Sequence, residues 1–86
     1  MDNFEKLLKE KTEKELIKIG NKLKKLRKAK GYSSPDKFAY DHNLNRSQYG
    51  KYEAGRTNLT IATLLGILSH FDISLEEFFA KDSGII

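Results

Sequence analysis

Apolar residues recur along the first third of the chain with the three- and four-residue spacing of an amphipathic helix. One apolar stripe covers residues 4–8, and a second covers residues 16–26. Between the two stripes, Thr12 and Glu15 have the types and the spacing of a capping box. The pattern therefore favours a short leading helix followed by a main helix over residues 13–30. A single continuous helix is the alternative.

Capping signals divide the rest of the chain into shorter helices. Ser34 is a typical N-cap residue, and the Pro35 that follows it suits the first position of a helix. Gly31 and Gly55 each follow a segment with a helical pattern, and they mark the ends of those helices. No run alternates like a strand, so the pattern predicts an all-α fold. The predicted later helices cover about residues 34–41, 45–54, 60–71 and 74–80.

The length of 86 residues allows one domain with short appendages. We expect an N-terminal helical extension over residues 1–12, a domain over residues 13–80 and a flexible tail over residues 81–86. The absence of cysteine excludes a disulfide scaffold, a thiolate metal site and cysteine catalysis. No secretory signal and no apolar run of membrane-spanning length occur. These features indicate a cytoplasmic protein that is not associated with a membrane.

Charge is distributed unevenly along the chain. Residues 1–30 hold eleven Lys or Arg against five Asp or Glu, whereas residues 59–86 hold one against four. Residues 18–30 include seven cations and no acid. This cluster is either a solvated helix face, a surface for phosphates or a basic helix on a membrane. We favour phosphates, because the apolar residues of this helix are needed to cover a small core.

Catalytic chemistry finds little support in the sequence. The two histidines, His42 and His70, stand at the ends of different predicted helices without carboxylates at the spacing of a metal site or a catalytic triad. No glycine follows a strand, so no phosphate-binding loop is predicted. We therefore expect no enzyme activity, no metal and no cofactor. Both histidines are interpreted as helix end caps or solvated side chains.

The segment over residues 34–55 carries the functional signal. Only residues 42–44 join its two short helices, too few for antiparallel packing, so the helices must cross steeply as in a helix-turn-helix. The second helix begins with side chains suited to the DNA major groove, because Arg46 can bind guanine and Gln48 can bind adenine. Any small helical bundle with a polar face is the structural alternative.

The run FAYDHNLNRSQYGKYEAG resembles the helix-turn-helix of the phage λ repressor/Cro-like, or XRE-type, family. Ala39, Leu44, Asn45, Glu53 and Gly55 carry the resemblance, which extends over about residues 19–79. It implies a five-helix, λ-repressor-like DNA-binding domain whose third helix, about residues 46–54, enters the major groove. The chain departs from the family at Ser34-Pro35, where Thr-Gln is common.

The resemblance also implies roles for individual residues. Arg27 and Glu53 match the positions of a structural ion pair that joins two helices beneath the DNA-facing surface. The base-facing positions are Arg46, Ser47, Gly50 and Lys51, and the phosphate-facing positions are Ser34, Gln48, Arg56, Thr57 and Asn58.

The sequence thus predicts a sequence-specific DNA-binding transcriptional regulator, a repressor or autoregulator, that is not an enzyme. Its expected partners are double-stranded DNA and a second copy of the chain. The dimer surface is predicted either at the extension or around Phe78 and Phe79. The alternative is an antitoxin-like or adaptor protein that binds a toxin or another regulator, because both ends of the chain carry apolar residues.

Overall fold

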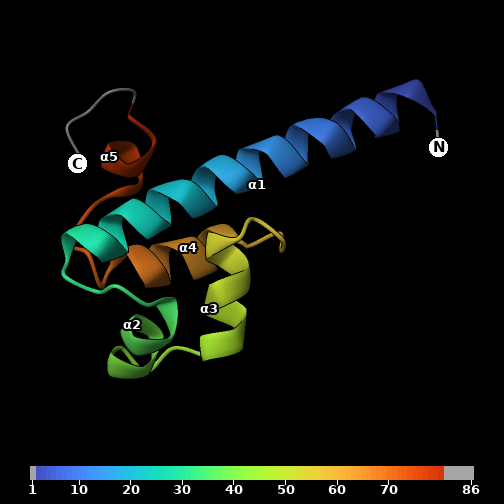
Figure 1. The fold of residues 1–86 in the computed structure, drawn as a ribbon. Coiled ribbons are helices and arrows are strands. Elements are labelled where there is room, and N and C mark those ends of the chain that lie inside the picture. The colour runs from blue at the N-terminus through green and yellow to red at the C-terminus, as the bar shows by residue number, and fades with distance from the viewer. Residues whose placement is uncertain (1, 81–86) are drawn as a thin grey trace.

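The computed structural model describes residues 2–80, which form five helices and no strand (Figure 1). The expected all-α fold is confirmed. The tail predicted over residues 81–86 lies outside the described residues. The helices are α1 (Asn3–Ala29), α2 (Pro35–Asp41), α3 (Arg46–Glu53), α4 (Ile61–Leu68) and α5 (Leu75–Phe79).

Helix α1 runs without a break through the predicted boundary at residue 12. Asp2 caps it, and its carboxylate accepts a hydrogen bond of 2.7 Å from the Glu5 amide. The Thr12 hydroxyl donates to the Leu8 carbonyl at 2.8 Å, so it bonds inside the helix and caps nothing. The prediction of two helices was therefore wrong, because the surrounding lysines and glutamates favour helix and nothing interrupts them. Although α1 is long, it is highly charged, and no helix in residues 2–80 could cross a membrane.

Side-chain caps start the four later helices, and the cap predicted at Ser34 is confirmed. Ser34, Asn45, Thr60 and Ser74 each accept a hydrogen bond from the backbone amide three residues on. Only at Ser74, among these four caps, does the residue three positions on complete a capping box by bonding back. Gln48, three positions after Asn45, does not complete a capping box. Helix α4 ends at Leu68, earlier than expected.

The core lies where α1 crosses the other helices. In Figure 1, α2 and α3 lie on one side of α1, and α5 lies beside the C-terminal half of α1. Helix α1 packs directly against both α2 and α3. Phe78 is fully buried, so it cannot belong to a dimer surface of the folded domain, whereas half of Phe79 is exposed. The N-terminal half of α1 extends beyond the rest of the molecule (Figure 1). The buried apolar residues are Leu23, Leu26, Phe38, Ala39, Tyr49, Leu64, Ile67, Leu68 and Phe78.

Candidate nucleic-acid interface

A tight turn holds α3 at a steep angle to α2. Asn43 adopts a left-handed conformation with φ of 62°, which asparagine tolerates better than most residues. The Leu44 amide then donates to the Ala39 carbonyl at 2.8 Å and closes the end of α2. Beneath the turn, the rings of Phe38 and Tyr49 pack with centroids 5.1 Å apart. The two helices are therefore fixed to each other by backbone and by core contacts.

The four residues predicted to face bases all lie on α3. Arg46 and Ser47 form its first turn and are exposed, as is Lys51 one turn later. Gly50 is half-buried, yet a Cβ atom added there would meet nothing within 4 Å. The helix thus presents polar side chains and an open backbone patch on one surface, which suits close approach to a flat ligand edge.

The residues predicted to face phosphates lie on three segments. Ser34 caps α2, where its oxygen accepts from the Lys37 amide at 3.3 Å and its own hydrogen remains free to donate. Arg56 and Asn58 are exposed in the loop after α3, with a half-buried Thr57 between them. Gln48 is half-buried and differs from the others, because it borders a pocket.

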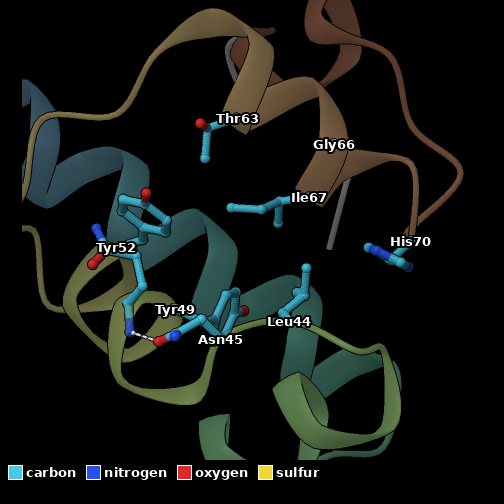
Figure 2. Close-up of a pocket in the computed structure, with 9 residues that line it drawn as sticks. Leu44, Asn45, Tyr49, Tyr52, Thr63, Gly66, Ile67 and His70 are labelled. Carbon is cyan, nitrogen blue, oxygen red and sulfur yellow. Dashed lines mark hydrogen bonds between the residues drawn. The ribbon is translucent and has the colours of Figure 1, made fainter.

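This pocket lies between α3 and α4 and has a volume of about 270 Å³ (Figure 2). Its walls are mostly apolar. Within residues 2–80 no three His, Cys, Asp or Glu residues come together as a metal site would need. The lining consists of Leu44, Asn45, Gln48, Tyr49, Tyr52, Thr63, Gly66, Ile67 and His70.

Arg27 and Glu53 join α1 to the end of α3. The guanidinium donates from Nε to Glu53 Oε2 at 3.0 Å and from Nη2 to Oε1 at 2.8 Å, and from Nη1 to the Tyr32 carbonyl at 3.0 Å. The two side chains are only 3% and 4% exposed. The hydrogen bonds to Glu53 raise the pKa of Arg27 above its usual value, although burial opposes this. The ion pair implied by the resemblance is thus present, buried and bidentate.

A close approach of two backbones accompanies this ion pair. Gly20 of α1 is buried against the carbonyl groups of Tyr52 and Glu53, where an added Cβ would lie 2.7 Å from the Tyr52 oxygen. Sequence reasoning missed this contact, since a glycine inside a helical pattern does not reveal its neighbour. Its position on the buried face of the predicted helix was the available signal.

Two further features, a buried phenol and a pair of half-buried histidines, were not foreseen. Burial raises the pKa of the Tyr49 phenol, as does the neighbouring Glu53 carboxylate, and the hydroxyl has no hydrogen-bond partner among the described residues. His42 and His70 lie edge to face with ring centroids 5.0 Å apart. Burial, with His42 and Lys30 nearby, lowers the pKa of His70.

A steep α2–α3 pair with a polar, exposed recognition surface defines a helix-turn-helix DNA-binding domain. The helix-turn-helix family model matches residues 23–78, and the chain belongs to this family, in its XRE-type form. The expected λ-repressor-like fold and the function as a DNA-binding transcriptional regulator are thereby confirmed.

Two relatives share most of the domain. The chain is 41% identical to the control protein C.MunI from Mycoplasma sp. over 64 residues, which span 74% of this chain and 86% of the relative. It is also similar to the crystal structure of the restriction-modification controller protein C.AhdI from Aeromonas hydrophila, with a TM-score of 0.67 and 34% identity. That match covers 78% of this chain and 96% of C.AhdI. These relatives support a regulator over the antitoxin-like or adaptor alternative.

Proposed function

We propose that this protein is a controller of a restriction-modification system that regulates transcription and has no enzyme activity of its own. The 41% identity to C.MunI along 86% of that protein carries the proposal. The structural similarity to C.AhdI supports it from an independent comparison. The regulator acts on DNA in the bacterial cytoplasm.

In this proposal α3 enters the major groove with its N-terminal turn foremost. Arg46 donates two hydrogen bonds to a guanine edge, and Ser47 and Lys51 contact neighbouring bases. The open backbone at Gly50 allows the helix to approach the base edges. Phosphate contacts from either end of the motif set the register of the helix and carry no sequence information themselves. Those contacts come from Ser34, Gln48, Arg56, Thr57 and Asn58.

We propose further that two copies bind DNA as a homodimer. A single helix covers only one half-site, and two-fold symmetry places a second half-site about 34 Å away. Ile61 and Leu65 lie four residues apart on α4 and are 59% and 48% exposed. Because these two exposed apolar side chains lie on one face of α4, inside the segment that the family model matches, we place the subunit contact there.

Selection of bound sites from random DNA tests the proposal. The wild-type chain should select a two-fold symmetric site, and that site should recur upstream of restriction-modification genes. Arg46→Ala should lose discrimination at about one base pair per half-site, worth roughly 1–3 kcal/mol. Arg56→Ala is the control, because loss of a phosphate contact weakens binding to all sequences alike. If Arg46→Ala selected the same site as the wild-type chain, α3 would not contact the bases as proposed.

A further inference from the structure

The first half of α1 has no role in the helix-turn-helix. Residues 3–15, called the arm from here on, precede the matched segment at residues 23–78. All but Thr12 of these residues are exposed, and none belongs to the core or packs against it. Figure 1 shows the arm projecting past the other four helices.

One face of the arm is apolar. Phe4, Leu7 and Leu8 are 72%, 56% and 53% exposed, and their spacing places them on one side of the helix together with Lys11. Lys9 and Glu13 lie on the opposite side. Three large apolar side chains on one exposed face favour association with another apolar surface.

The charge of the arm argues against DNA as its partner. The arm contains four lysines and four glutamates, whereas residues 16–30 contain seven cations and no acid. A helix that binds phosphates or an anionic membrane needs excess positive charge, and the arm has none. An apolar face flanked by balanced charges instead resembles the seam of a helix pair.

We propose that the arm pairs in antiparallel orientation with the arm of a second copy of this chain. Lys11 continues the apolar face and selects this orientation. In a parallel pair two Lys11 ammonium groups would meet, whereas an antiparallel pair with Leu7 opposite Leu8 places Lys11 against the ring of Phe4. The molecule already shows such a contact, since Lys22 Nζ lies 5.5 Å from the centroid of the Phe78 ring.

Arm pairing is weak between free copies of the chain. It becomes strong when another contact already holds two copies close together. Two helical turns on each copy bury far less than the roughly 1,200 Å² of a stable interface. Once DNA or a subunit contact holds the copies close, the second contact becomes effectively intramolecular and gains affinity without new interactions. The arm therefore joins two homodimers into a tetramer, and this consequence rests on the proposed function. The pairing of the arms does not.

Engineered thiols test the pairing directly, because the full chain contains no cysteine. Leu8→Cys should oxidise to a disulfide-linked dimer, since residue 8 lies at the centre of the pair. Lys11→Cys should form at least tenfold less of the disulfide-linked dimer. Lys9→Cys, on the opposite face of the arm, measures the dimer formed by random collision. Leu8→Cys that links no better than Lys9→Cys would refute the pairing. Lys11→Cys that links as well as Leu8→Cys would refute its antiparallel orientation.

Sedimentation of the full chain separates the two contacts. The wild-type chain should shift from dimer to tetramer with rising concentration, and Leu7→Ala/Leu8→Ala should abolish this shift. Lys9→Ala/Glu13→Ala is the control, because it removes opposite charges from the other face and should change nothing. The arm variant should bind a single DNA site as the wild type does. A failure of DNA binding in every variant would overturn the proposed function alone, and a wild-type chain that never exceeds a dimer would overturn the tetramer.

Discussion

Arg27 and Glu53 are the only charged residues buried among residues 2–80, and they join the two helices whose relative angle matters most. Burying two charges is costly, and the cost is offset only by good geometry. The bidentate contact, with the Tyr32 carbonyl as third acceptor, provides that geometry. We interpret the pair as a device that fixes the tilt of α3 relative to α1.

A double-mutant cycle measures this contribution. Glu53→Gln leaves the Arg27 charge buried without its partner and should destabilise the fold by about 3–5 kcal/mol. Arg27→Met should cost a similar amount, and the double variant should cost much less than the sum of the two. Denaturant melts give these values. Coupling below about 1 kcal/mol, as for a solvated pair, would contradict the interpretation.

His70 should make stability depend on pH near neutrality. Its lowered pKa means that the folded state binds a proton less readily than the unfolded state, whose histidine titrates near 6.5. Stability is therefore greatest above pH 6.5 and falls as the pH drops through the pKa of the folded state. Melts between pH 7 and pH 5 should show a smaller loss for His70→Gln. Equal losses in both proteins would remove His70 as the cause.

For single residues, the sequence predicted local roles, such as helix caps, better than tertiary contacts. An N-cap such as Ser34 follows from local chemistry and could be found without a structure. The contact between His42 and His70 could not, because the residues are far apart in sequence and meet only through tertiary packing. The roles of Arg46 and its neighbours on DNA remain predictions.

Helix α1 and helix α3 are held together by backbone contact as well as by charge. The missing side chain of Gly20 lets the carbonyl groups at the end of α3 approach the axis of α1. This is why a residue of poor helix propensity stands inside the longest helix. The arm and the body of α1 are continuous, so the direction of the arm is tied to the position of α3.

Two glycine substitutions distinguish the effect of helix packing on stability from the effect of helix propensity. Gly20→Ala should destabilise the fold by about 2 kcal/mol, because the gain in helix propensity is outweighed by a clash with rigid backbone. Gly66→Ala should instead stabilise by about 0.5–1 kcal/mol, since an added Cβ meets nothing within 4 Å there. Thermal melts of both variants decide the matter. Stabilisation by Gly20→Ala would mean that the two helices lie farther apart.

Element boundaries show where sequence reasoning stops. The starts of α2, α3 and α5 follow from cap residues, which are local signals, whereas the start of α4 was predicted from its apolar periodicity. The break at residue 12 was wrong because Thr12 fits both a cap and a helix interior, and only the intact helix shows which role it takes. The end of α4 was misplaced because an apolar pattern continues past Leu68 into a turn that packs on the core.

At the scale of the whole molecule, the sequence showed how much positive charge the chain carries. It did not show which surface of the folded molecule carries that charge. Most cations of the first third lie on α1. The side of α1 at Gly20 meets α3, and Lys25, five residues on, lies about 140° around the helix from it. Part of the basic charge thus faces away from α3, whereas Arg56 lies three residues beyond Glu53, the last residue of α3.

The salt dependence of DNA binding tests which cations touch phosphates. Each phosphate contact releases condensed counterions and contributes about −0.9 to the slope of log affinity against log salt concentration. Arg56→Ala should therefore make the slope shallower by about 0.9 for each protomer in the complex. Lys25→Ala removes the same charge from the far side of α1 and should leave the slope nearly unchanged. Equal changes in the two variants would mean that binding follows net charge and not the contacts assigned to the end of α3.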